Sequence, residues 1–307
     1  MPSWEEVMRE MKPHQDNIGI LVPGLTSDEL RRKYTALLSE HTGRNVIVYY
    51  SGWLAGLDDD VGVNDNDMTG FINAMQGLDT SRGLDLILHT PGGDPNAAEA
   101  IVHYLHSQFG NDIRVIVPHM AMSAGTMISC AAKSILMAQH SALGPVDPQI
   151  GGIPAYNIVK EFQDAKEDID QNPNAAHYWA IRLKKYLQAH AYLASDAIAL
   201  ANSLIGPWLR NYMFADYPKD QELKKRVDRI RDKLNSNNKS HGRHFNYDFC
   251  RKLGLRVAAL EADPQMYDLV MGVHNACIIA TQFFGVSKLI ENQLGARYMT
   301  RQEGQGG

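Results

Sequence analysis

The stretch HMAMSAGTMISCAAKSI, residues 119–135, places a serine directly before an apolar run with helical composition. A serine in this position most often caps the helix, because its side-chain oxygen accepts a hydrogen bond from a backbone N–H of the first turn. The same position also suits a nucleophile, since the free N–H groups and the dipole of the first turn favour the negative charge of acyl transfer. Taken alone, Ser123 is predicted to be a cap.

Short apolar strands alternate with amphipathic helices on both sides of this stretch. Runs such as LDLILHT (84–90) and IRVIVP (113–118) are continuously apolar, which is typical of strands buried on both faces. Helix-forming segments separate them, and the intervening one carries Ile101, Leu105 and Phe109 on one stripe. This order predicts a parallel, layered α/β sheet with right-handed crossovers. We expect its strands at residues 18–24, 46–52, 84–90, 113–118 and 134–138, and helices at 26–41, 65–78, 94–109 and 123–133.

The pattern changes in the second half of the chain. The sequence pattern predicts consecutive helices over about residues 156–234. A polar loop, a short helix closed by Gly254 and a last strand are expected after them. A long helix is expected over about 264–291, before a flexible tail at 292–307. We therefore predict that the whole chain is one domain. Its parts are an α/β core (about 15–160 and 240–258), a helical insertion (about 156–234), a C-terminal helix and the tail.

Composition excludes several classes of protein. The chain of 307 residues has a net charge of −5, and a nucleic-acid binder needs a clustered basic surface. Its three cysteines form no CxxC pair, which argues against a disulfide framework or a zinc site and favours a reducing cytoplasm. The N-terminus lacks the apolar core of a signal peptide. Residues 269–287 lack Asp, Glu, Lys and Arg, but His274, other polar residues and glycines interrupt them, so a buried or oligomer-contact helix is expected rather than a membrane span.

A second glycine-containing turn, HTPGGDP (89–95), follows the strand at 84–90. It matches neither a GxGxxG nor a GxxxxGK[ST] phosphate-binding motif, so we expect an ATP-independent chain. Two successive glycines let backbone N–H groups approach a ligand closely, which suits an oxyanion hole, although a plain turn has the same composition. One helix and one strand separate Gly93 from Ser123, so this βαβα arrangement brings both turns to the same edge of the sheet.

Together these segments resemble the Clp-fold serine peptidases. HTPGGDPNAAEAI, MSAGTMIS and ALGPVDPQIGG are most similar to the serine dehydrogenase proteinase family, a distant relative of the proteolytic subunit of Clp protease. The resemblance runs from about residue 46 to 160 and resumes near 240–256. It implies a Clp/crotonase-like, mostly parallel sheet with flanking helices and a serine peptidase that forms an acyl-enzyme on Ser123. The backbone N–H groups of Gly93 and Ala124 would form the oxyanion hole.

The family's order of catalytic residues is Ser, Asp, His. In this chain that order points to Asp147, between two prolines, and to a histidine in SHGRHFNYDFCRKLGL. Counting back from the LGL segment, His241 takes the family's histidine position, and His244 is the competitor. Structural alternatives remain, because Asp147 could cap its turn and His241 could be a solvated loop residue.

Three other interpretations stay open. Related peptidases use a Ser/Lys dyad, for which Lys160 falls in the right region, although an exposed helix position is the plainer reading. His140 and His89 lie near the two turns, where strand-end and structural hydrogen-bonding roles are expected. A crotonase-like acyl-CoA enzyme or a catalytically inactive Clp-fold scaffold is the alternative to a peptidase.

The resemblance also implies partners. It implies a peptide or protein substrate, no metal or organic cofactor, and a homo-oligomer such as a trimer, hexamer or ring. We expect no nucleic-acid partner and no membrane span.

Overall fold

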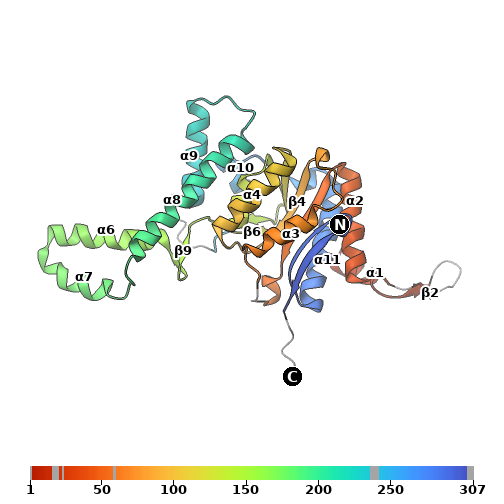
Figure 1. Ribbon diagram of the computed structural model, residues 1–307, viewed down its shortest axis with the longest axis horizontal. Helices are drawn as coiled ribbons and strands as arrows, with labels where there is room; N and C mark the ends of the chain where they lie inside the picture. The colour runs from red at the N-terminus through yellow and green to blue at the C-terminus, as the bar shows by residue number, and fades with distance from the viewer. Residues whose placement is uncertain (1, 16–20, 23, 58–59, 236–241, 303–307) are drawn as a thin grey trace, which may run out of the picture.

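A seven-stranded, mostly parallel sheet forms the centre of the computed structural model, which describes residues 2–15, 21–22, 24–57, 60–235 and 242–302 (Figure 1). The strands, in their order across the sheet, are β12 (Val257–Ala259), β7 (Ser134–Met137), β5 (Ile113–Val117), β4 (Leu84–His89), β3 (Asn45–Ser51), β13 (Val286–Asn292) and β14 (Arg297–Arg301). The first five are parallel, whereas β13 runs antiparallel to β3, and β14 antiparallel to β13. The predicted parallel α/β class is confirmed.

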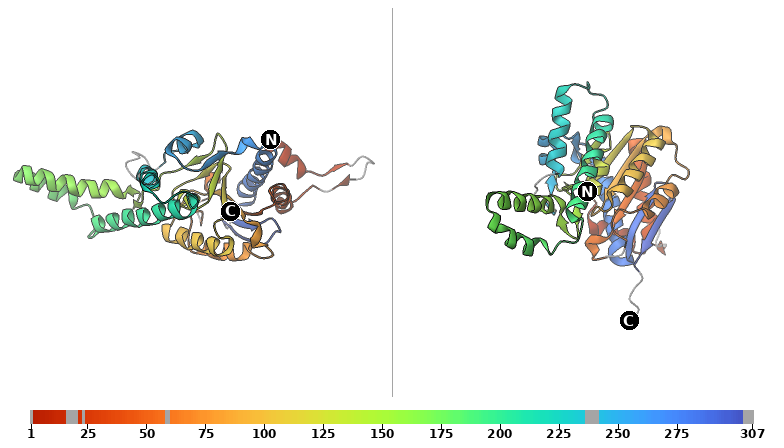
Figure 2. Two further views of the ribbon diagram at one scale, coloured as in Figure 1. Left: turned by 90° about the horizontal axis from the view of Figure 1, so that it is seen from above. Right: turned by 60° about the vertical axis from the view of Figure 1, so that its left-hand side comes forward.

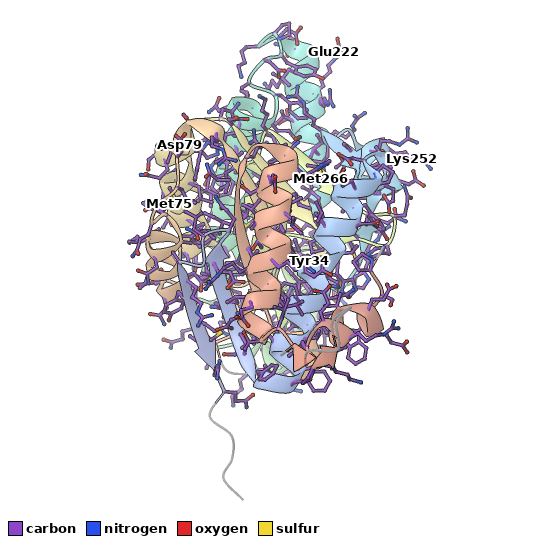
Figure 3. All side chains as sticks on the ribbon, turned by 90° about the vertical axis from the view of Figure 1, so that its right-hand side faces the viewer. Tyr34, Met75, Asp79, Glu222, Lys252 and Met266 are labelled. Atoms are coloured by element: carbon purple, nitrogen blue, oxygen red, sulfur yellow. The ribbon has the colours of Figure 1, made fainter. Side chains whose placement is uncertain are left out.

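Helices cover both faces of this sheet. One face carries α1 (Trp4–Glu10), α2 (Ser27–Thr42) and α11 (Pro264–Phe284), and the other carries α3 (Asn66–Ala74), α4 (Pro95–Phe109) and α5 (Ala124–Cys130). Figure 3 shows α2 and α11 side by side, with Tyr34 on α2 and Met266 on α11. Alternate residues of β3 point to opposite faces, so Val48 packs with α2 and α11 while Tyr49 packs with α3. Local signals match these elements: Thr26 and Glu29 form a capping box at the start of α2.

A small three-stranded sheet lies at the edge of the core and holds the segments next to Ser123 and Asp147. Its order is β11 (Phe245–Asn246), β8 (Ala142–Leu143) and β6 (Met120–Ala121). β6 and β8 are parallel, and β11 runs antiparallel to β8. The sheet therefore brings together the segment before α5, the loop after β8 and the chain that enters α10 (Tyr247–Leu253). Two further pairs are β1 (His14–Gln15) with β2 (Leu21–Val22) and β9 (Gln149–Ile150) with β10 (Ile153–Pro154).

The helical insertion projects from the core as an arm. It consists of α6 (Ala155–Gln171), α7 (Ala176–Leu183), α8 (His190–Trp208), a π-helical turn (Leu209–Met213) and α9 (Gln221–Asn235). Figures 1 and 2 show α6 and α7 extending away from the sheet, and α8 returning to it. The last turns of α8 enter the main core through Leu204, Ile205 and Trp208. The expected run of helices is confirmed here. Short 3₁₀ turns complete the described elements at Trp53–Ala55, Thr80–Arg82, Pro173–Ala175 and Leu260–Ala262.

The C-terminal prediction is wrong in part. α11 ends at Phe284, where Gly285 takes a left-handed conformation (φ 61°), and residues 286–301 then form the pair β13–β14 in place of a continued helix and a flexible tail. The segment VSKLIEN is a buried strand although it contains charged residues, which are typical of exposed positions. Lys288 and Glu291 are both buried, and each pairs with a side chain of opposite charge from a neighbouring helix.

Two other segments bear on the sequence expectations. The strand expected at 18–24 lies mostly outside the described residues, and Leu21–Val22 pair with β1 rather than with the central sheet. In the described part of the chain, no helix combines the length and apolar character that crossing a bilayer requires.

Candidate active site

Ser123 occupies a strained turn between β6 and α5. Its φ of 46° and ψ of −112° lie in a region that residues with a side chain rarely adopt, and such strain persists only where the surrounding structure enforces it. The predicted cap is absent, since its hydroxyl accepts no hydrogen bond from the first turn of α5. Within the described ranges this hydroxyl has no hydrogen-bond partner at all, and the side chain is half-buried. A strained serine between a strand and a helix is the arrangement of a nucleophile elbow.

The glycines of the PGG turn allow the chain to approach Ser123. Gly92 has a φ of 100°, and a Cβ there would lie 2.5 Å from the Cβ of Ser123 and 2.8 Å from the carbonyl oxygen of Met122. Any side chain at this position would push the two turns apart. Gly92 therefore fixes the distance between the PGG turn and the serine.

The backbone of Gly93 is aimed by a short pairing with Val63. The N–H of Val63 donates to the carbonyl of Gly92, and the N–H of Asp94 donates to the carbonyl of Val63, both at 2.8 Å. Successive backbone groups of an extended chain point to opposite sides, so the N–H of Gly93 points away from Val63. Among the described residues this N–H has no acceptor, nor does the N–H of Ala124 at the start of α5. Two free donors thus flank the turn that carries Ser123.

A cavity of about 440 Å³ opens beside the serine. Its walls are largely apolar, and the described residues that line it include no charged side chain. One wall belongs to α8, through Ala197, Leu200 and Ala201. The remaining lining residues are Pro91, Gly93, Pro95, Asn96, Ser123, Met127, Val146, Pro148 and Gln149. The insertion therefore forms part of this cavity.

The loop that carries Asp147 contacts α5, because the N–H of Gly144 donates to Oγ1 of Thr126 at 2.9 Å. The neighbours of Asp147 on both sides line the cavity, namely Val146, Pro148 and Gln149. Asp147 itself is buried, with only 5% of its surface exposed. Nε2 of Gln149 donates to Oδ2 of Asp147 at 3.0 Å. The structure thus brings Ser123 and the Asp147 loop to the same cavity.

The two candidate histidines differ in what the structure describes. His241 lies outside the described residues. The described residues on both sides of it lie beside the Asp147 loop, because the N–H of Val146 donates to the carbonyl of Leu234, and Phe245 pairs with Leu143. His244, directly before β11, is exposed and is not among the residues that line the cavity.

The other basic candidates have structural roles. Lys160 has a side chain that is 54% exposed, and its ion pair with Asp164 raises its pKa, whereas a lysine base needs a lowered pKa. This exposed, ion-paired environment does not favour Lys160 as a base. A ring nitrogen of His140 lies 3.0 Å from the carbonyl oxygen of Pro118, and Nδ1 of His89 accepts from the N–H of Met120, so both structural readings are confirmed.

Neither metal ligation nor thiol chemistry is indicated at this cavity. In the ranges the structure describes, no group of three or more His, Cys, Asp or Glu side chains is arranged to hold a metal ion. Cys130, Cys250 and Cys277 are free and buried, and burial raises the pKa of each thiol.

Several residues of this site had not been singled out from the sequence. Val63 pairs with the PGG turn, Thr126 bonds the loop after β8, and Gln149 contacts Asp147. Thr126 lies inside MSAGTMIS and Gln149 inside ALGPVDPQIGG, whereas Val63 lies in no motif and is thirty residues from Gly93 in the sequence.

Comparisons with known proteins match the central part of the chain. Residues 63–176 match the family model of the ClpP-like SDH-type serine proteinases. Two uncharacterized proteins of Methanocaldococcus jannaschii are similar. One is 43% identical over 102 residues (33% of this chain and 35% of the relative), and the other is 43% identical over 86 residues (28% and 29%). The matched region thus spans about a third of the length of these curated relatives. The family match confirms the resemblance that the PGG turn, Ser123 and the Asp147 loop indicate, and over residues 63–176 the chain is similar to the ClpP-like SDH-type serine proteinases.

Proposed function

We propose that the chain is a serine peptidase that hydrolyses peptide bonds through an acyl-enzyme on Ser123. One observation carries the proposal: the hydroxyl of Ser123, unbonded within the described residues and held by strained backbone, sits beside the free N–H groups of Gly93 and Ala124 at an apolar cavity. Free N–H groups near a nucleophile can bind the oxyanion of the tetrahedral intermediate. The family match of residues 63–176 supports the same activity.

In the proposed reaction Ser123, Asp147 and His241 act as a triad. The imidazole of His241 takes the proton from Oγ as this oxygen attacks the substrate carbonyl carbon, and then gives the proton to the leaving amine. The carboxylate of Asp147 holds the ring in the required tautomer. Water then attacks the acyl-enzyme by the same route and releases the acid. The position of the described residues before and after His241, both beside the Asp147 loop, supports this assignment.

Covalent labelling tests the nucleophile directly. A fluorophosphonate should add one mass increment to the intact chain, at Ser123, and Ser123→Ala should abolish both labelling and peptide hydrolysis. Ser129→Ala is the matched control, because Ser129 is buried on the same helix and its hydroxyl donates to the carbonyl of Gly125. A folded but unlabelled chain would contradict the peptidase and favour a crotonase-like enzyme or an inactive scaffold.

A second experiment tests the choice of base. His241→Gln should lower kcat for a peptide amide by a factor of about 10³ or more, the usual cost of losing a triad member. His244→Gln and Lys160→Met should leave kcat within a few-fold of the unsubstituted chain. A large loss in His244→Gln with a small one in His241→Gln would transfer the role of base to His244.

We propose further that the substrate is a peptide or protein and that the chain forms a homo-oligomer through its helical arm. Apolar side chains on this arm are exposed, among them Tyr178 (55%), Ile181 (61%) and Tyr192 (77%). Exposed apolar side chains that gather on one element favour a protein contact. Ile181→Asp should therefore lower the oligomeric mass in analytical ultracentrifugation. Ile72→Asp, at a similarly exposed position on α3, should not.

A further inference from the structure

A buried lysine ammonium lies close to the loop that pairs with the PGG turn. Lys288 of β13 is fully buried, and its Nζ lies 2.7 Å from Oδ1 of Asp67, 2.7 Å from the carbonyl oxygen of Gly62 and 3.3 Å from Oδ1 of Asp60. Its charge is thus compensated by two carboxylates and a carbonyl. A buried lysine without such partners would be strongly disfavoured.

Asp67 ties this cation to the sheet and to the start of α3. The carboxylate is fully buried, and its Oδ2 accepts hydrogen bonds from Oη of Tyr49 at 2.8 Å and from the N–H of Asn64 at 3.0 Å. Burial raises the pKa of Asp67, and the charge of Lys288 opposes that rise. Asn64 also donates to Asp60 and to the carbonyl of Gly62. The network therefore crosslinks residues 60–64, which we call the clamp loop, to β3, α3 and β13.

The clamp loop touches the PGG turn directly. A Cβ at Gly62 would lie 3.3 Å from the carbonyl oxygen of Gly92. The next residue, Val63, makes the two backbone hydrogen bonds that aim the N–H of Gly93. Gly62 is thus held by Lys288 on one side and lies against the PGG turn on the other. A shift of the clamp loop would move Gly93.

We propose that the buried Lys288–Asp67 pair is a positioning unit for the oxyanion hole, which acts through Val63 on the N–H of Gly93. This inference rests on the proposed peptidase function. Lys288 and Asp67 are not among the described residues that line the cavity. Their effect on the reaction is to keep one hydrogen-bond donor fixed in advance, which is what oxyanion stabilisation requires.

The chain supplies a matched control on the same strand. Arg31 of α2 and Glu291 of β13 form a second buried pair, with 2.8 Å between Nε and Oε1. Glu291 is three residues from Lys288, so it points to the opposite face of the sheet, toward α2 and away from the clamp loop. The variant Lys288→Met/Asp67→Asn and the variant Arg31→Met/Glu291→Gln each remove one buried charge pair. The single variant Asp67→Asn keeps Asp60 as a partner for Lys288, and serves if the first double variant does not fold.

Two readouts test the proposal on the full chain. Hydrogen exchange followed by mass spectrometry should become at least about 10-fold faster in residues 62–64 and 92–94 of the clamp variants, and not in the Arg31/Glu291 variant, since exchange reports local opening. For a peptide substrate, kcat should fall by about 10- to 100-fold with KM nearly unchanged, because an oxyanion donor acts only in the transition state.

The outcomes separate the two hypotheses. Unchanged exchange at residues 92–94 in the clamp variants overturns the positioning role, whatever the activity. An equal loss of kcat in the Arg31/Glu291 variant overturns it as well, because the loss would then follow from general destabilisation. Faster exchange in a chain whose hydrolysis does not depend on Ser123 would contradict the peptidase, and with it the catalytic consequence of the clamp, while the mechanical link to Gly93 would stand.

Discussion

The hydroxyl of Thr126 and the backbone of Gly144 bond each other in both directions. Oγ1 of Thr126 accepts from the N–H of Gly144 at 2.9 Å and lies 3.0 Å from its carbonyl oxygen. Oγ1 also lies 2.8 Å from the carbonyl oxygen of Ala121, so this carbonyl and that of Gly144 compete for its one proton. Thr126 is fully buried on α5, three residues after Ser123. This contact joins α5 to the loop that leads to Asp147.

Thr126→Val should remove the hydrogen bond between α5 and the N–H of Gly144. Valine keeps the shape of threonine but leaves the buried N–H of Gly144 without its acceptor, which costs about 1–3 kcal/mol of unfolding free energy. We expect a lower midpoint in urea and a fall in kcat, because the Asp147 loop loses its anchor to α5. Thr126→Ser, which keeps the hydroxyl, should restore most of both. If the valine variant lost stability but kept full kcat, the contact would be structural only.

Ser123→Gly should be more stable than Ser123→Ala. The backbone of Ser123, at φ 46° and ψ −112°, costs on the order of 1–3 kcal/mol for a residue with a Cβ. Glycine relieves this strain and alanine does not, while both remove the hydroxyl. The difference should appear as a higher urea midpoint for the glycine variant. Equal midpoints would mean that the turn is not strained in solution.

A cluster of two buried histidines, His89 and His274, and the half-buried His119 predicts acid sensitivity. The rings of His89, His119 and His274 have centroids 5.5–5.8 Å apart, and Tyr50 contacts both His89 and His274. Burial, followed by the charges of His119 and His140, lowers the pKa of His274 from 6.5 to about 3. Between pH 6.5 and about pH 3, His274 is therefore protonated in the unfolded chain but stays neutral in the folded one. Stability from this residue is complete above pH 6.5 and falls by about 1.4 kcal/mol per pH unit down to about pH 3.

His274→Gln should flatten that dependence. Unfolding free energies measured in urea at pH 7, 6 and 5 should decline less steeply in the variant, because glutamine does not take up a proton on unfolding. His103→Gln, at an exposed position on α4, should retain the steep decline. A decline that is identical in the two variants would show that His274 is not held neutral by the fold.

The central sheet could be predicted from the sequence because its signals are local. The run at β4 is buried at every position, and α4 presents Ile101, Leu105 and Phe109 on a single buried stripe. Such patterns depend only on the period of a strand or a helix. The family resemblance rested on turns of the same kind, in which Gly92 fits where no side chain could.

The remaining features depend on partners that are distant in the sequence. The pattern favours a helix at β13 because Lys288 and Glu291 look like surface residues. Their burial is made acceptable by partners that are distant in the sequence, among them Asp67 and Arg31. The direction of the Gly93 N–H depends on Val63, thirty residues earlier in the sequence. The two residues form an isolated β-bridge, and no sequence motif marks Val63. Spacing alone cannot reveal contacts of this kind.

Ala197→Phe should narrow the range of substrates. Ala197 of α8 lines the apolar cavity beside Ser123, so the side chain next to the scissile carbonyl is expected to be apolar and uncharged. A phenylalanine at this position would occupy much of the space. In peptide amides that differ only in this residue, kcat/KM should fall about 10-fold or more for leucine and phenylalanine, and less for alanine, since a methylene in a pocket is worth about 1–3 kcal/mol. Ala199→Phe, on the exposed face of α8, is the control and should leave the order of substrates unchanged. A uniform loss for all three peptides would mean that the cavity does not hold this side chain.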